Sequence, residues 1–205
     1  MSIGKQNNRS VLPEYTVDNL GTSFKVVLVN SAQRTMGENG PEVFIPDFQG
    51  LVKRIAITRA AHPLKLRGQD IRFLRKTLGL KSRDLAEKLD VSPEHLSRCE
   101  SGEKILSSNS EKVLRTLVLL EAVFVLQKAI EDHGQRNDLS KRLSAILEKL
   151  RDVFSGLRIS PVHTADEELI LHFKLEAQDQ KTAANDRGDT KAEWLDEAEM
   201  AAKAA

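Results

Sequence analysis

The chain has 205 residues, 40% of them hydrophobic and 30% charged, which predicts a soluble globular protein of one large or two small domains. Only 4% are aromatic and one is a cysteine, which argues against a base-stacking single-strand binder and excludes an internal disulfide and a zinc site built on cysteine pairs. The net charge of +1 conceals an uneven distribution: nine basic residues and one acid lie between Leu51 and Lys81, but eleven acids and five bases lie between His163 and Ala205.

Residues 1–62 are expected to form a small module that contains a β-hairpin. Phe24–Asn30 is rich in β-branched residues and predicts a strand, and Glu42–Ile45 predicts a second one. The glycine, asparagine and proline residues between them favour an antiparallel hairpin. Asp47 can cap a helix over Phe48–Arg59.

Residues 63–108 predict short helices joined by tight turns. Apolar residues three or four positions apart mark the buried faces of the first two helices: Ile71, Leu74 and Leu78, then Leu85, Ala86 and Leu89. Gly79 ends the first helix, and Ser82 is the expected N-cap of the second. Asp90 then occupies a turn position that requires a left-handed backbone.

A third helix is predicted to begin after Ser92, which can cap it. Pro93 fits its first turn, and Gly102 ends it. Two short helices separated by such a turn form a helix-turn-helix, whose second helix can enter the major groove of DNA.

The predicted interface divides into residues that read bases and residues that hold phosphates. We expect base contacts from Ser92, Glu94, His95 and Arg98, and phosphate contacts from Arg67, Lys81, Arg83 and Lys104. Arg98 can bond to O6 and N7 of guanine, and Glu94 can accept a hydrogen bond from cytosine. One helix-turn-helix contacts few bases, so we expect a dimer on an inverted repeat with half-sites about one helical turn apart.

The three-helix stretch resembles the Cro/C1-type (XRE) helix-turn-helix family. The resemblance rests on IRFLRKTLGL, RDLAEKLDVSPEHLSR and the closing ESG at Glu100–Gly102. It implies a lambda-repressor-like domain that binds double-stranded DNA and regulates transcription. Arg83 replaces the glutamine usual in the family, and Cys99 replaces the usual tryptophan, so we expect Cys99 to be buried.

A longer stretch, roughly residues 12–106, is similar to bacterial regulators of the MqsA antitoxin family. The similarity rests on YTVDNLG, VLVN and PEVFIPDFQGL ahead of LRGQDIRFLRKTLGL. In that group a small β-containing module precedes the Cro/C1 domain, but the family's zinc cysteines are absent here, so no zinc is carried over. The similarity suggests an alternative function: an antitoxin or adaptor whose main partner is a protein and whose DNA binding is autoregulation.

Residues 109–160 predict two helices. Glu111–Glu131 is apolar around nearly its whole circumference, so later elements or a second subunit must cover it. Asp138–Gly156 is amphipathic, and its stripe either packs on the preceding helix as a hairpin, forms a dimer interface, or does both. The residues expected at a dimer interface are Leu139, Leu143, Ile146, Leu147, Leu150 and Phe154.

Residues 161–205 predict a strand followed by an acidic tail. Leu169–Leu175 reads as a strand that joins the N-terminal hairpin or pairs with its copy across a dimer. Lys191–Lys203 has a helix-forming composition and is either a weakly held helix or a tail that orders on a partner. A protein partner could bind through this tail or through the N-terminal module. The expected fold is therefore mainly α with a small β component.

No catalytic, metal or cofactor site is predicted, and we do not expect an enzyme. None of the five histidines pairs with another histidine or a cysteine at metal-binding spacing, and the chain has no phosphate-binding glycine loop. The most hydrophobic run, Leu117–Leu126, is too short to span a bilayer, and no export signal is evident. We therefore expect a cytoplasmic protein, either a repressor or autoregulator, an antitoxin or adaptor, or a DNA-independent scaffold.

Overall fold

The computed structural model describes residues 9–37, 40–133, 136–155, 168–177 and 192–204. These residues form seven helices and five strands, so the fold is mixed and its β component is larger than predicted. Contacts group the chain into two units. The sheet unit contains Met1–Asn19, Phe24–Arg54 and Leu169–Ala205, and the helical unit contains Leu20–Ser23 and Ile55–Glu168.

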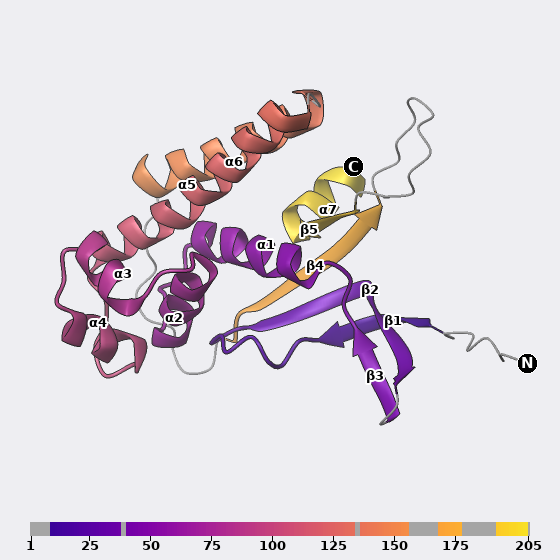
Figure 1. Cartoon of the computed structure of the whole chain (residues 1–205), viewed down its shortest axis with the longest axis horizontal. Helices are drawn as coiled ribbons and strands as arrows, with labels where there is room; N and C mark the ends of the chain where they lie inside the picture. The colour runs from indigo at the N-terminus through magenta and orange to yellow at the C-terminus, as the bar shows by residue number, and fades with distance from the viewer. Residues whose placement is uncertain (1–8, 38–39, 134–135, 156–167, 178–191, 205) are drawn as a thin grey trace, which may run out of the picture. The chain divides into compact units, whose positions relative to one another are not determined.

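The sheet unit is built around one long central strand (Figure 1). Its strands are β1 (Ser10–Thr16), β2 (Lys25–Gly37), β3 (Gly40–Phe44), β4 (Ile170–Ala177) and β5 (Ala192–Asp196). β2 pairs antiparallel with β1 and β3 and parallel with β4, and β4 pairs antiparallel with β5. β2 and β3 form an antiparallel hairpin, but β3 pairs with residues 33–37, beyond the predicted strand Phe24–Asn30. The predicted C-terminal strand pairs with β2 in the same sheet.

The core of the sheet unit comes from alternate residues of its central strands. Val26 and Leu28 of β2 and Phe173 of β4 are fully buried, as expected when one face of a strand is covered. Strand β1 was not predicted from the sequence. Its pairing with β2 shifts register between Leu12 and Glu14, and this irregularity breaks the alternation that marks a regular strand.

The C-terminal segment is held within the sheet unit. The prediction that Lys191–Lys203 is one helix is wrong in its first part, because residues 192–196 form β5 on the edge of β4 and only Glu197–Ala204 is helical (α7). Trp194 is buried and its Nε1 donates to the carbonyl of Asp47 at 3.1 Å. Arg54 pairs with Asp196 at 3.1 Å and also with Glu199.

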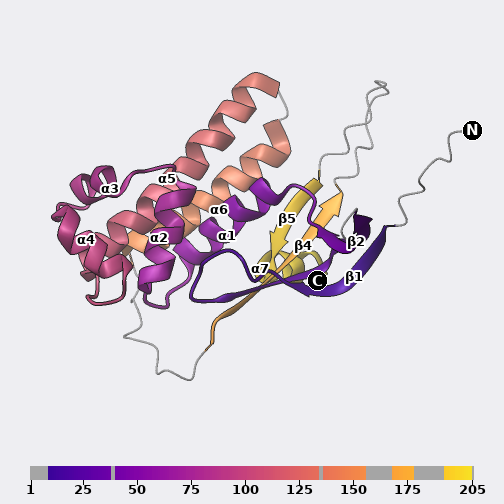
Figure 2. The ribbon, with the colours of Figure 1, turned by 60° about the horizontal axis from the view of Figure 1, so that its bottom comes forward.

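The other helices follow one another along the chain: α1 (Phe48–Ala61), α2 (Gly68–Thr77), α3 (Ser82–Lys88), α4 (Pro93–Glu100), α5 (Ser108–His133) and α6 (Arg136–Ser155). Figure 2 shows α5 and α6 side by side, the packing expected from one of the predicted alternatives, a helical hairpin. The first half of α1, to Arg54, is grouped with the sheet unit and the rest with the helical unit. No described helix is both long and apolar enough to cross a membrane.

The turns around α2, α3 and α4 have the backbone that the sequence required. Gly79, Asp90 and Gly102 all adopt positive φ angles, of 68°, 53° and 86°. The prediction that Ser82 caps α3 is wrong: Ser82 is the first helical residue, and Lys81 precedes it. The carboxylate of Asp84 accepts a hydrogen bond from the backbone N–H of Lys81 at 3.3 Å, which gives that N–H a partner at the start of α3.

The two compact units differ in extent from the four predicted regions. The predicted regions 63–108 and 109–160 both belong to the helical unit, together with the second half of α1. The sheet unit combines most of the N-terminal module with the C-terminal segment. The strands that meet in one sheet are thus contributed by opposite ends of the chain.

Candidate nucleic-acid interface

Helix α4 presents one buried face and one open face. Its inner side chains, Leu96 and Cys99, are fully buried. Glu94, Ser97 and Arg98 lie on the opposite face and are exposed. Ser92 caps the helix as predicted, since its hydroxyl accepts from the backbone N–H of His95 at 3.1 Å. The helix expected to meet bases is therefore not covered by the described part of its own chain.

A buried ion pair ties α4 to α2. Arg75 donates to both carboxylate oxygens of Glu100, at 2.6 Å and 3.0 Å, and Glu100 is buried. This hydrogen bonding raises the pKa of Arg75 above its usual value. Gly68, at the start of α2, lies so close to the end of α4 that an added Cβ would be 2.5 Å from the carbonyl oxygen of Cys99.

A second buried charge holds the start of α2. Asp70 is fully buried and pairs with Arg59 at 2.8 Å. Its carboxylate also accepts from the hydroxyl of Ser23 at 2.6 Å and from the backbone N–H of Arg67 at 3.0 Å. These bonds join the end of α1, the segment before β2 and the first turn of α2 at one point.

A third cluster attaches α5 to the segment between α1 and α2. Arg115 and Glu111 are fully buried and pair at 2.7 Å, and Lys65 approaches the other oxygen of Glu111 at 2.6 Å. The guanidinium of Arg115 also donates to the carbonyl oxygens of Arg59, Ala60, His62 and Leu64. Arg115 thereby satisfies carbonyls at the C-terminal end of α1, which have no partner within that helix.

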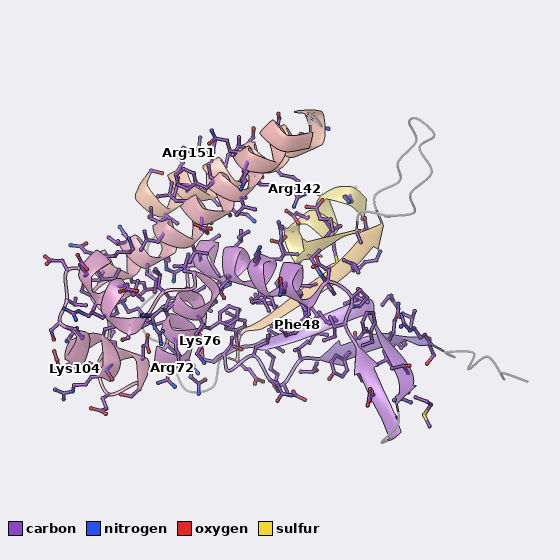
Figure 3. The ribbon with its side chains drawn as sticks, in the orientation of Figure 1. Phe48, Arg72, Lys76, Lys104, Arg142 and Arg151 are labelled. Carbon is purple, nitrogen blue, oxygen red and sulfur yellow. The ribbon has the colours of Figure 1, made fainter. Side chains whose placement is uncertain are left out.

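Exposed cations flank the open face of α4. The four predicted phosphate contacts are all exposed: Arg67 before α2, Lys81 and Arg83 at the start of α3, and Lys104 after α4. Figure 3 labels two more cations on α2, Arg72 and Lys76, which the sequence analysis counted as basic but did not assign to the interface. Their spacing of four residues, which places both on one face of a helix, is the signal that could have identified them.

The predicted base contacts differ in how they are presented. Arg98 is open to solvent, and its Nε donates to Glu103 at 3.3 Å. His95 is half-buried, with its Nε2 at 3.6 Å from the sulfur of Cys99. Ser97, which the sequence analysis did not name individually, is exposed beside Glu94 and Arg98.

The pKa values of Glu94 and Cys99 in α4 are shifted in opposite directions. Hydrogen bonds from its own backbone N–H and from Ser92 lower the pKa of Glu94, so its carboxylate is charged at neutral pH. Burial raises the pKa of Cys99, although Lys104 and Lys65 act in the other direction. Cys99 therefore remains a neutral thiol in the core, as the sequence analysis expected of a tryptophan replacement.

A protein-family model described as helix-turn-helix matches residues 71–117. The match covers most of α2, all of α3 and α4, and the start of α5. It supports a Cro/C1-type (XRE) helix-turn-helix and hence a DNA-binding regulator of transcription. Searches of curated proteins and of solved structures found no match. The similarity of the N-terminal half to MqsA-family regulators is not shown by these comparisons and stays a prediction.

Proposed function

We propose that the protein is a sequence-specific regulator that binds double-stranded DNA as a dimer on an inverted repeat and acts as a repressor or autoregulator. The observation that supports this most directly is the open face of α4, with Glu94, Ser97 and Arg98 exposed above buried Leu96 and Cys99. A helix held in this way can enter the major groove without any change in the domain that carries it. We propose binding rather than catalysis as its activity, in the cytoplasm, where a chromosomal operator would be reached.

Arg98 is proposed as the main reader of sequence. Its ion pair with Glu103 is exposed on both sides, and such pairs are worth about 0–1 kcal/mol. A bidentate contact with guanine is worth about 1–3 kcal/mol of discrimination. Arg98 can therefore exchange Glu103 for a base with a net gain. Glu94, with its lowered pKa, remains an acceptor for the amino group of cytosine at neutral pH.

The surrounding cations are proposed to fix the position of the domain on the duplex. Six of them flank α4: Arg67, Arg72, Lys76, Lys81, Arg83 and Lys104. Each phosphate contact adds about −0.9 to the slope of log K against log salt. If all six contact phosphates, each chain contributes a slope of about −5.

Fluorescence anisotropy with tiled duplexes from upstream of the protein's own gene tests this proposal. Arg98→Ala should relax the preference at one base pair, whereas Arg83→Ala should weaken all duplexes and reduce the salt slope by about one. Arg151→Ala is the matched control, because Arg151 is an exposed arginine on α6, away from the predicted site (Figure 3). Unchanged affinity and preference in Arg98→Ala would refute the assigned reading residue.

A second candidate function is an antitoxin or adaptor whose main partner is a protein. One observation favours it: Met36 and Val43 lie on the same face of the β2–β3 hairpin and are 72% and 38% exposed. Exposed apolar clusters often mark protein contacts. Purification from the native host should then recover a small protein at stoichiometric amounts, and Met36→Glu should abolish its recovery without affecting DNA binding.

A further inference from the structure

Helix α5 has two apolar faces, and the described part of its own chain buries only one of them. Leu114, Val118 and Leu119 are buried, on the same side as the Glu111–Arg115 pair. On the other side Val113 is 41% exposed and Phe124 is 64% exposed, and Leu117 and Leu120 between them are half-buried. Because apolar helix faces are normally covered, this second face requires an occupant.

The four residues of the open face form a coiled-coil seam. Val113, Leu117, Leu120 and Phe124 are separated by four, three and four positions, which is the d–a–d–a spacing of a heptad. At 100° per residue they lie within about 60° of one another around the helix. We call these four residues the α5 seam. Such a seam accepts another helix that runs nearly parallel or antiparallel to it.

We propose that the α5 seam pairs antiparallel with the α5 seam of a second copy of this chain. This inference rests on the proposed function, since a dimer is what an inverted-repeat operator requires. The pattern of the seam is symmetric about the midpoint between Val118 and Leu119. A two-fold axis at that point places Val113 opposite Phe124 and Leu117 opposite Leu120.

The ends of the seam support a second copy rather than an unrelated helix. Ser110 and Gln127 continue the same spacing beyond Val113 and Phe124, and they would also lie opposite each other in the pair. The seam is thus apolar in the middle and polar at both ends, and the smaller Val113 opposes the larger Phe124. This is the self-complementary arrangement that a two-fold interface needs.

The size of the seam predicts a weak dimer. A buried aromatic side chain covers about 150–250 Å², so Phe124 at 64% exposure offers roughly 100–160 Å² and is the largest contributor. Two four-residue seams bury several hundred Å², below the roughly 1,200 Å² at the lower end of stable interfaces. Self-association therefore depends on protein concentration and strengthens when DNA with two half-sites holds both copies.

The α6 stripe is a less suitable interface than the sequence analysis expected. Ile146 and Val153 on this stripe are buried within the chain, whereas Leu147 is 47% exposed. The side chains of Leu139 and Phe154 lie outside the described residues. The stripe is thus used in part inside one chain, and Leu147 provides a control position for experiments on the seam.

Disulfide trapping in the full-length chain tests the antiparallel register. Residues 113 and 124 are about 16 Å apart along one helix, too far for a bond within one chain. Under mild oxidation Val113→Cys/Phe124→Cys should give a reducible covalent dimer, while each single variant stays monomeric. A dimer from Val113→Cys alone would indicate parallel pairing and overturn the proposal, as would no dimer from the double variant.

Sedimentation equilibrium over a concentration series tests the seam itself. Phe124→Glu should weaken self-association at least tenfold, whereas Leu147→Glu should leave it within twofold of the wild type. Both positions are exposed, so far-UV circular dichroism should show both variants folded. Loss of the dimer in Leu147→Glu with no change in Phe124→Glu would assign the interface to α6 instead.

The outcomes for the seam and for DNA binding can be told apart. If the wild type binds no duplex but the double cysteine variant still cross-links, the seam stands and the proposed function fails. If the wild type binds its operator but remains monomeric, and the double cysteine variant does not cross-link, the seam alone is refuted. With both correct, Phe124→Glu keeps its weak binding to a single half-site and loses at least tenfold in affinity for the full inverted repeat.

Discussion

Replacing Arg115 with Met is expected to destabilise the helical unit by about 3–5 kcal/mol, the usual cost of removing one partner from a buried ion pair. The side chain of Arg115 is fully buried and bonds to Glu111 at 2.7 Å and to the carbonyl oxygens of Ala60 and Leu64 at 2.9 Å and 2.7 Å. Burial lowers the pKa of Arg115, and the carboxylate of Glu111 opposes that shift. Methionine keeps the helix propensity and much of the volume but none of these bonds.

A double variant separates the ion pair from the carbonyl contacts. In Arg115→Met the buried carboxylate of Glu111 keeps only Lys65 as a cationic partner, and in Arg115→Met/Glu111→Gln that charge is removed, so we expect part of the lost stability to return. Lys65 limits this recovery, because it then loses its own partner at 2.6 Å. The carbonyl of Ala60 loses its bond to the guanidinium in both variants, and an unsatisfied buried carbonyl costs about 1–3 kcal/mol.

Urea unfolding followed by two probes measures the effect. Far-UV circular dichroism follows mainly the helices, whereas fluorescence follows Trp194, the only tryptophan, in the sheet unit. With a slope of about 2 kcal/mol per M urea, the loss corresponds to a midpoint lower by roughly 1.5–2.5 M. A loss under about 1 kcal/mol by circular dichroism would refute the role assigned to Arg115.

Three further changes test other contacts. Arg75→Ala should lower the free energy of unfolding, measured in urea, by about 3 kcal/mol and weaken DNA binding, because it leaves the buried Glu100 without its bidentate partner. DNA binding equal to that of the wild type would show that this pair does not orient α4. Because the pKa of Cys99 is higher in the folded than in the unfolded chain, the thiol stabilises the fold below its unfolded pKa of about 8.5, and this stabilisation is lost as pH rises through the folded pKa. The urea midpoint of the wild type should therefore fall above about pH 8.5, and that of Cys99→Ala should fall less. Trp194→Phe removes the bond to the Asp47 carbonyl and should cost about 0.5–1.5 kcal/mol, measured by thermal unfolding.

The helix-turn-helix could be predicted because its signals are local. The cap at Ser92 and the left-handed turn residues Asp90 and Gly102 lie within a few positions of the helix ends that they define. The apolar spacing of α2 and α3 gave their buried faces in the same way. Each of these features depends on interactions that span about one turn of helix.

The missed strands depend on partners far away in the sequence. Residues 192–196 have no strand composition, and β4 supplies the edge that makes them β5, with Trp194 and Leu195 buried on it. The register shift after Leu12 obscures the alternation in β1. Strand propensity is weak where tertiary pairing decides the outcome, so the sheet was underestimated.

The exposed residues of the predicted interface were easier to identify from the sequence than the buried ion pairs that hold its helices together. Exposed cations such as Lys81 and Arg83 can be read from composition, and their exposure follows from their place on short amphipathic helices. Arg59 and Asp70 look the same in the sequence, yet they are fully buried and pair across eleven positions. Only Glu111 and Arg115 have the i,i+4 spacing that a sequence can reveal.

The three buried carboxylates of the helical unit share one structural role. Asp70 holds the start of α2, Glu100 holds the end of α4 against α2, and Glu111 holds the start of α5. Each accepts from a cation on another segment of the helical unit, so the direction of α4 is set by charge pairs whose geometry is specific as well as by apolar packing. Since a displacement of about 1 Å can disrupt a bidentate base contact, a substitution at Glu100 should alter DNA recognition as strongly as one at Arg98, although Glu100 is buried and Arg98 faces solvent.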